Sequence, residues 1–219
     1  MNPKLRVFWR EWILPAVVAV AILAPLRSAV ADWNDVPTGS MIPTILVGDR
    51  IFINKLAYDL KVPFTTWHVA TWADPQRGDI IVFPSPADGV RLVKRVVAVP
   101  GDRLELRNDH LIINGETATY AHTDNDTATA LVLNETVSGK THSLMIQPQQ
   151  RAMRSFGPVE VPPGRYFVMG DNRDNSFDSR YFGFVSRGSI LGRATLVAMS
   201  FDHDHHYQPR LDRFGHSLP

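Results

Sequence analysis

Ser40 and Lys94 are the two residues whose types and surroundings in the sequence best suit covalent catalysis. Ser40 follows Gly39 in the segment Pro37–Thr44, where glycine permits a tight turn and the flanking prolines stiffen the backbone. A serine on such a turn can act as a nucleophile, with backbone N–H groups close enough to bind an oxyanion. A Gly-Ser-Met run also occurs in ordinary loops, so this segment alone does not distinguish a catalytic serine from a loop serine without a function.

Lys94 lies in a predicted strand, Arg91–Val99, in which successive side chains point to opposite faces. Lys94 therefore shares its face of the strand with apolar side chains only: Leu92, Val96 and Ala98. Arg95 points to the opposite face. An ammonium group on an apolar face is costly to keep charged. We therefore expect the pKa of Lys94 to fall below ~10.4, as a general base near neutral pH requires. The alternative is an edge-strand lysine that prevents aggregation.

A third polar segment, residues 170–180, follows the predicted strand Tyr166–Met169. Such a run must satisfy its polar groups internally, and Asp178 with Arg180 is the pair that we expect to fix its shape. A plain solvated turn and a calcium loop are the alternatives. Calcium is disfavoured because an EF-hand needs Glu at its twelfth position, where this segment has Tyr181.

Histidine and cysteine chemistry are disfavoured. None of the eight histidines lies in the three segments, and Gly-x-Ser-x-Gly is absent, so a Ser–Lys arrangement is favoured over a Ser–His triad. The absence of cysteine excludes thiolate catalysis and Cys-ligated metal centres. The histidine-rich run 202–206 could chelate a metal, but we favour a solvated tail over 202–219. A net charge of +1 gives no global field that favours nucleic acid.

Residues 12–31 are predicted to form one transmembrane helix, because about twenty predominantly apolar residues span a bilayer. Lys4, Arg6 and Arg10 precede it against a single Glu11, which places residues 1–11 in the cytoplasm and the rest outside by the positive-inside rule. The alternative is a cleavable signal peptide that ends at the A-x-A pattern of residues 29–31.

The remaining sequence predicts a mostly β fold, with short apolar runs between Gly, Pro, Asn and Asp. Asn108 and Asp109 indicate a hairpin turn. Residues 32–115 and 158–201 are predicted to form the β core, and the polar stretch 116–157 an insertion or smaller lobe. Residues 59–77, with Phe64, Trp67 and Trp72, are interpreted as a long loop that touches lipid. The predicted strands are Arg50–Leu56, Asp79–Phe83, Arg91–Val99, Arg103–Arg107, Leu111–Asn114, Tyr166–Met169 and Ile190–Phe201.

Four segments, in this order, resemble bacterial type I signal peptidases, the membrane-anchored Ser–Lys peptidases of family S26. They are Pro-Thr-Gly-Ser-Met-x-Pro-Thr at 37–44, Arg-Gly-Asp-Ile-Ile-Val-Phe at 77–83, Val-Lys-Arg-Val-Val at 93–97 followed by Pro-Gly-Asp, and Gly-Asp-Asn-Arg-Asp-Asn-Ser-x-Asp-Ser-Arg-Tyr-x-Gly at 170–183. The sequence departs from the usual pattern at Thr38, where many members have Ser, and at Ala98, where Gly is usual. The resemblance implies a core of coiled antiparallel sheets with a smaller inserted lobe.

The resemblance also implies a role for each site residue. Ser40 would be the nucleophile and Lys94 the general base, while the Ser40 N–H and the Thr38 hydroxyl would form the oxyanion hole. Met41 would contribute to substrate binding. The supporting residues would be those that orient the lysine and hold the loop: Ser176, Asp178 and Arg180.

As its substrates, the resemblance implies exported preproteins with small residues at positions −1 and −3. It implies no metal, cofactor or nucleic acid. The enzyme would lie in the bacterial inner membrane as a single-pass protein, with its catalytic domain on the periplasmic or extracellular side. The alternatives are a Ser–Lys peptidase dedicated to one substrate such as a conjugation-pilus subunit, a self-cleaving LexA-like protein, or a membrane-tethered β-domain without catalysis.

Overall fold

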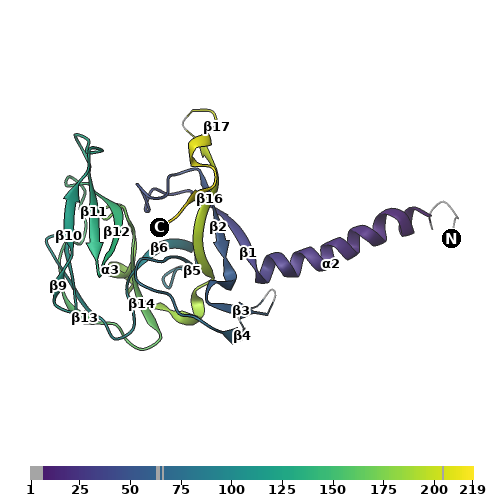
Figure 1. The fold of residues 1–219 in the computed structure, drawn as a ribbon, viewed down its shortest axis with the longest axis horizontal. Helices are drawn as coiled ribbons and strands as arrows, with labels where there is room; N and C mark the ends of the chain where they lie inside the picture. The colour runs from purple at the N-terminus through teal and green to yellow at the C-terminus, as the bar shows by residue number, and fades with distance from the viewer. Residues whose placement is uncertain (1–6, 63–64, 66, 204) are drawn as a thin grey trace.

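The N-terminal helical segment projects away from a β-rich body in the computed structural model, which describes residues 7–62, 65, 67–203 and 205–219 (Figure 1). A short π-helix η1 (Trp9–Ile13) continues into helix α2 (Leu14–Ala29), and strand β1 (Ala31–Asp35) follows almost directly. The helix thus ends two residues before the predicted limit. Across the described residues, no helix has both the length and the apolar character needed for a membrane crossing. Lys4 and Arg6 lie outside the described residues.

The main sheet has nine strands and carries most of the core. Its central order is β1-β2-β16-β5-β6-β14-β15, and every pairing along this path is antiparallel. All predicted strands are present, with ends that differ by at most two residues. The bounds are β2 Asp49–Asn54, β5 Ile80–Pro84, β6 Arg91–Ala98, β14 Arg165–Met169, β15 Val185–Ser186, β16 Gly192–Asp202, β17 Gln208–Pro209 and β18 His216–Ser217.

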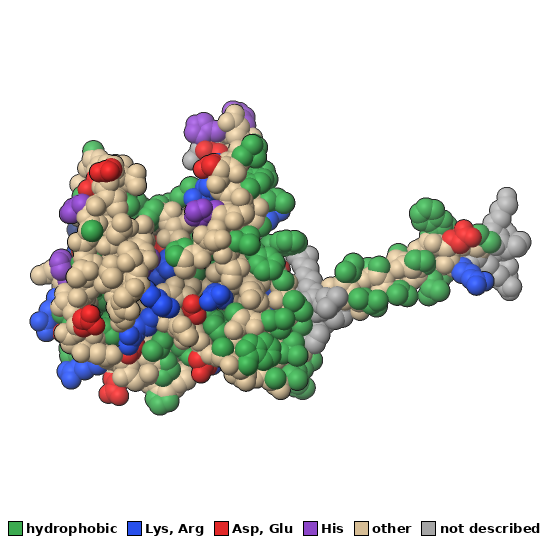
Figure 2. Space-filling model, in the orientation of Figure 1, with side chains coloured by type: hydrophobic (Ala, Val, Ile, Leu, Met, Phe, Trp, Pro, Cys, Tyr) green, Lys and Arg blue, Asp and Glu red, His purple; other side chains and the backbone are tan. Residues whose placement is uncertain are grey.

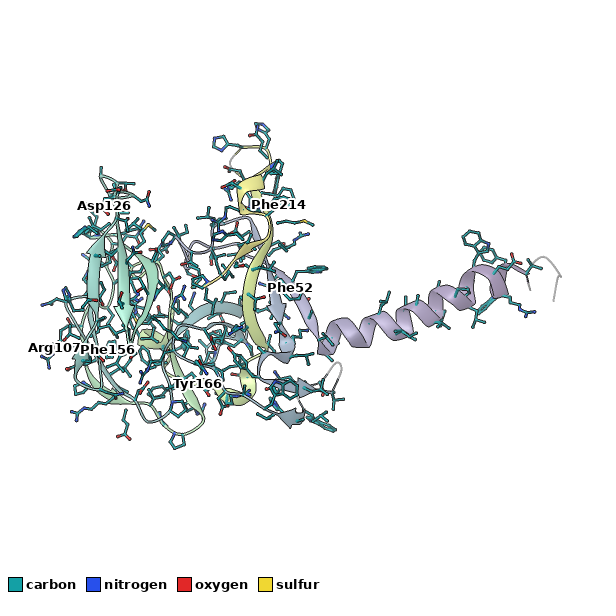
Figure 3. The ribbon with its side chains drawn as sticks, in the orientation of Figure 1. Phe52, Arg107, Asp126, Phe156, Tyr166 and Phe214 are labelled. Carbon is teal, nitrogen blue, oxygen red and sulfur yellow. The ribbon has the colours of Figure 1, made fainter. Side chains whose placement is uncertain are left out.

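A smaller lobe lies on the side of the body opposite to the projecting helix, and Asp126 marks its tip (Figures 1 and 3). One of its two sheets has the order β13-β7-β8-β9 and the other β10-β11-β12. The first sheet therefore crosses the predicted limits of the 116–157 insertion. Its strands β7 and β8 precede the insertion, β9 begins it, and β13 extends beyond its end. The bounds are β7 Arg103–Arg107, β8 His110–Ile113, β9 Glu116–Thr117, β10 Thr119–His122, β11 Leu131–Val137, β12 Lys140–Ile146 and β13 Phe156–Glu160.

The turn between β7 and β8 confirms the predicted hairpin. Asn108 and Asp109 have φ angles of 48° and 66°. A two-residue hairpin turn needs left-handed backbone at both positions to match the strand twist, and Asn and Asp tolerate that conformation better than most residues.

The prediction of a long loop over 59–77 is wrong in part. Strands β3 (Asp59–Lys61) and β4 (His68–Thr71) pair antiparallel within it. Their side chains are partly exposed or exposed except at Asp59, so the apolar alternation that marks a strand is missing from the sequence. Phe64, which we included in this segment, lies outside the described residues.

The C-terminal segment folds back on the main sheet. The histidines of the run near residue 203 are exposed, as expected of a solvated run. However, β17 and β18 both pair with β16. Arg213 also connects this segment to the start of β2 and to the loop before it. Its guanidinium donates to Asp49 Oδ2 at 2.6 Å and to the carbonyl of Thr44 at 3.1 Å.

Three hydrophobic clusters contain residues of β6, and two of them anchor it toward its two ends. One cluster packs Met41 and Ile45, from the loop after β1, against Val93 and the strands β2, β5 and β16. The other joins the end of β6 at Val97 to the first lobe sheet. Strand β6 is thus fixed at both ends, because its apolar residues are anchored in separate clusters. The remaining helical turns are η2 Lys55–Ala57, α3 Ser179–Phe182, η3 Arg187–Ser189 and η4 Leu211–Arg213.

Candidate active site

The structure brings Ser40 and Lys94 into direct contact. Ser40 lies in the loop of residues 36–48, between β1 and β2, which we call the Ser40 loop. Lys94 lies in the middle of β6, and its Nζ is 2.5 Å from the Ser40 Oγ. The two residues are 54 positions apart in the sequence. The contact therefore depends on the packing of the Ser40 loop against the sheet through Met41 and Ile45.

Lys94 is 2% exposed, so its ammonium form has lost almost all hydration. This desolvation lowers the pKa of Lys94 to about 8. The negative charges of Asp178 and Asp171 act in the opposite direction, and the positive charge of Arg180 adds to the lowering. At neutral pH, a usable fraction of Lys94 is then uncharged and can accept a proton from the serine hydroxyl beside it.

The Ser40 loop is held from the other side by residues 170–180, which we call the polar loop. The backbone N–H of Asn172 donates to the Ser40 carbonyl at 3.1 Å, and its side-chain amide donates to the Gly39 carbonyl at 3.0 Å. A Cβ atom at Gly170 would lie only 2.4 Å from the Ser40 carbonyl oxygen. The close approach of the two loops therefore requires glycine at 170.

A buried ion pair links the polar loop to β6. Arg95 donates through Nε and Nη2 to the two carboxylate oxygens of Asp171, both at 2.8 Å. Thr44, from the Ser40 loop, donates to the same carboxylate at 2.5 Å. Burial raises the pKa of Asp171, but Arg95 and its hydrogen bonds outweigh burial and lower that pKa overall. This group therefore stays charged and ties three segments together.

Asp178 and Arg180 form an ion pair inside the polar loop. Arg180 Nε donates to Asp178 Oδ1 at 2.9 Å, and both side chains are fully buried. The Asp178 carboxylate also accepts from the backbone N–H of Gly170 at 3.0 Å and caps the first turn of α3. Together these bonds close the loop on itself between its first and last residues.

The other predicted site residues lie around this contact in different environments. Thr38 is exposed in the turn that carries Ser40. Met41 is buried in the core beneath that turn. The Ser176 hydroxyl is buried and has no hydrogen-bond partner among the described residues, so the predicted bond to Lys94 is not made in this structure. It lies 2.3 Å from the position that a Cβ on Gly170 would occupy.

Sequence reasoning did not assign a role to Asn172, Arg95 or Asp171. A signal for each was present: Asn172 and Asp171 belong to the polar segment, and Arg95 is next to the candidate base. Their partners could not be assigned, because Arg95 and Asp171 are 76 positions apart.

Comparisons with known proteins cover this site. Residues 9–199 match the family described as signal peptidase, peptidase S26. A signal peptidase I from Pseudomonas fluorescens is 37% identical over 195 residues, which span 82% of this chain and 69% of that protein. A signal peptidase I from Bacillus amyloliquefaciens is 33% identical over 202 residues, spanning 92% and 90%. A crystal structure of a signal peptidase I from Enterococcus faecalis aligns at 38% identity with 57% of this chain and 100% of that chain, with a TM-score of 0.38.

Proposed function

This chain belongs to the signal peptidase family, peptidase S26, and is a serine endopeptidase of the signal peptidase I type that removes signal peptides; from this premise we propose that Ser40 and Lys94 are its catalytic pair. The observation that carries the proposal is the 2.5 Å distance between the Lys94 Nζ and the Ser40 Oγ, with the lysine almost entirely buried. A nucleophile in hydrogen-bond contact with a base of lowered pKa is the arrangement that acyl transfer needs.

Acylation begins when neutral Lys94 takes the proton of the Ser40 hydroxyl as its oxygen attacks the scissile carbonyl. The developing oxyanion accepts hydrogen bonds from the Ser40 N–H and the Thr38 hydroxyl. Within the described residues, the Ser40 N–H donates to no protein acceptor, which leaves it available to a substrate. When the tetrahedral intermediate collapses, Lys94 gives its proton to the leaving amine and an acyl-enzyme remains.

Deacylation uses the same base a second time. Lys94, neutral again, takes a proton from a water molecule that attacks the ester. It gives that proton to the Ser40 oxygen when the second tetrahedral intermediate collapses, which releases the carboxyl product and restores the serine hydroxyl and the neutral lysine. The role we propose for Ser176 is to accept a hydrogen bond from Lys94 and orient it. The buried hydroxyl of Ser176 supports this role, since a buried polar group without a partner is costly and is available to a neighbour. Asp178 and Arg180 hold the loop that carries it.

The substrates that we propose are exported preproteins with small residues, typically Ala, at positions −1 and −3 before the cut. Met41 lies directly after the nucleophile, and its side chain is buried in the same hydrophobic cluster as Val36 and Val93. In this proposal, Met41 forms the floor on which a small substrate side chain rests. No metal or cofactor takes part.

The proposed location is the bacterial inner membrane, with one anchor formed by η1 and α2 together. At ~1.5 Å per residue, the run from Trp9 to Ala29 is about as long as a ~30 Å hydrocarbon core is thick. Many of its large apolar side chains are exposed: Val17, Val18, Val20, Ile22 and Leu23. Since no described part of the body covers them, lipid is the environment that suits them. The N-terminus would be cytoplasmic and the β body on the outer side.

Exposed hydrophobic side chains also gather on the body around β3 and β4, near the base of the helix (Figure 2). The exposed residues in and directly beside β4 include Trp67, Val69 and Trp72. Tryptophan is favoured at membrane interfaces because its ring is largely apolar and its N–H is polar. In this proposal the region rests on the bilayer and brings Ser40 near the membrane surface, where a signal peptide emerges from lipid.

Of the alternatives, a non-catalytic tethered domain conflicts with the family membership, and no observation favours a peptidase dedicated to one substrate, such as a conjugation-pilus subunit. One assay tests the proposed nucleophile and substrate class. The purified full chain is incubated in detergent with a preprotein that has Ala at −1 and −3, and Ser40→Ala serves as the control. We expect mature product only with the intact serine. Cleavage by Ser40→Ala would contradict the proposed nucleophile, and no cleavage by either protein would contradict the proposed substrate class.

A further inference from the structure

The smaller lobe contacts the polar loop over much of its length. The backbone N–H of Met145, near the end of β12, donates to the Asp171 carbonyl at 2.8 Å, and the Arg173 N–H donates back to Met145 at 2.9 Å. Beyond β12, the Gln147 N–H donates to Asp174 Oδ2 at 2.7 Å. Further along, Arg154 Nη2 reaches the same oxygen at 2.8 Å. The lobe therefore packs directly against the loop that holds the nucleophile.

A buried ion pair lies at the centre of this contact. Glu135, on β11, accepts hydrogen bonds from Arg173 Nη1 at 3.0 Å and Nη2 at 2.6 Å. Both side chains are at most 3% exposed. The Tyr120 hydroxyl donates to the same carboxylate at 2.6 Å, and His142 Nε2 lies 3.3 Å from it. Burial raises the pKa of Glu135, but Arg173 and His142 outweigh burial and lower that pKa overall, so the pair is charged.

The pair acts next to the residue that holds the nucleophile. Arg173 follows Asn172, whose backbone and side chain donate to the Ser40 and Gly39 carbonyls. If the Arg173 side chain is fixed, the backbone of Asn172 has little freedom to move. The Glu135 carboxylate thus acts on Ser40 indirectly, through Arg173 and Asn172, two consecutive residues of the polar loop.

We propose that Glu135 is a positioning residue for the signal-peptidase reaction, and that the lobe serves through it to hold the polar loop against Ser40. The inference rests on the proposed function of Ser40 and Lys94. A buried ion pair adds little net stability compared with apolar residues of similar volume, but it requires one defined geometry. Because Arg173 follows Asn172, which donates to the Ser40 and Gly39 carbonyls, the ion pair also fixes the position of Ser40.

The test is a pair of variants that separates positioning from stability. Glu135→Gln leaves the Arg173 charge buried without its partner, which costs stability. The double variant Glu135→Met/Arg173→Met removes both charges and keeps the volume, so we expect it to fold. Glu105→Gln is the matched control, because Glu105 is in the same lobe and its only ion-pair partner among the described residues is the exposed Arg107. Each is assayed as the full chain in detergent, with circular dichroism to measure the folded fraction.

For the folded double variant, we expect kcat to fall on the order of 10²-fold with little change in KM, because a small displacement of reacting groups has that cost. We also expect the acid limb of the kcat/KM profile to move to higher pH. A loosened polar loop admits water to Lys94, and hydration restores the ammonium form that burial disfavours. The charged groups around Lys94, namely Asp171, Asp178 and Arg180, are unchanged in this variant.

Three outcomes would contradict different parts of the account. If the wild type cleaves, Ser40→Ala does not, and the folded double variant keeps the wild-type kcat and acid limb, then the positioning role of Glu135 is wrong while the catalytic pair stands. If Ser40→Ala cleaves as well as the wild type, the proposed pair itself is wrong. An equal loss in Glu105→Gln would assign the effect to the lobe in general and would also overturn the role of Glu135.

Discussion

The two faces of β6 each bury one cationic side chain, and the two side chains have different partners. On one face, Lys94 is 2% exposed and contacts the neutral hydroxyl of Ser40. On the other, Arg95 is equally buried but donates two hydrogen bonds to the Asp171 carboxylate and one to the Gly78 carbonyl. Adjacent residues of one strand thus share burial and formal charge and differ in their partners.

The difference separates a group that reacts from a group that supports. A buried charge with a full set of partners keeps its charge and fixes geometry, as Arg95 does between β6, the polar loop and the Ser40 loop. A buried charge with few partners is destabilised in its charged form, and its pKa shifts until it can exchange protons near neutral pH. The Lys94 face is therefore the face on which proton transfer is possible.

The largest effect is expected from removing the reactive cation. Lys94→Met should abolish cleavage, with a fall in kcat on the order of 10⁴- to 10⁶-fold, because Ser40 then lacks its base. The measurement is single-turnover cleavage of a preprotein with Ala at −1 and −3, with Lys140→Met as the matched control. Residual activity within tenfold of the wild type would remove the distinction between the two faces.

Removing the supporting cation should mainly cost stability. Arg95→Met leaves the Asp171 carboxylate buried without its partner, at a cost of about 3–5 kcal/mol in the free energy of unfolding. Urea denaturation measures this loss, and Arg107→Met, which removes an exposed guanidinium, is the control. An Arg95→Met protein as stable as the wild type would show that this pair is not the support that the geometry indicates.

The same substitution on the reactive face should have the opposite sign. The pKa of Lys94 is about 8 in the folded protein and ~10.4 in the unfolded chain, so the unfolded chain binds more protons between these values. Wild-type stability should rise with pH across this window, and below it the charged lysine costs about 3 kcal/mol. Lys94→Met should therefore be more stable at pH 7, by an amount that shrinks toward pH 10. Urea titrations at both pH values measure it, and a variant less stable at pH 7 would contradict the desolvated-lysine account.

The smallest effect concerns the charges near Lys94. Asp178 raises the pKa of Lys94 and Arg180 lowers it. Asp178→Asn should therefore lower the pKa of Lys94 further and move the acid limb of kcat/KM to lower pH in the molecules that fold. A pH–rate profile of the soluble variant measures the direction, and a shift to higher pH would mean that loop opening outweighs the lost charge.

The sequence predicted what depends on local pattern. Alternation along β6 predicted Lys94 on an apolar face and Arg95 on the other, and Lys94 is buried as its apolar neighbours imply. The Asn108–Asp109 pair indicated a hairpin because few other residues tolerate its backbone. These inferences need only the geometry of a strand or a turn.

What the sequence did not predict depends on distant partners. Arg95 finds Asp171 76 positions away, and Glu135 finds Arg173 38 positions away. No local rule selects those partners, because each carboxylate reaches its arginine only after the sheets have packed. The β3–β4 hairpin was missed for a related reason, since its mostly exposed side chains give no alternating pattern.

The most direct test of the central claim is the pKa of the Lys94 amine itself. With ¹³C-labelled lysine, the Cε signal can be followed against pH by NMR and assigned by its absence in Lys94→Met. We predict a midpoint near 8, retained in Ser40→Ala because desolvation is the main cause. A midpoint near ~10.4, the value of an exposed lysine, would contradict the account.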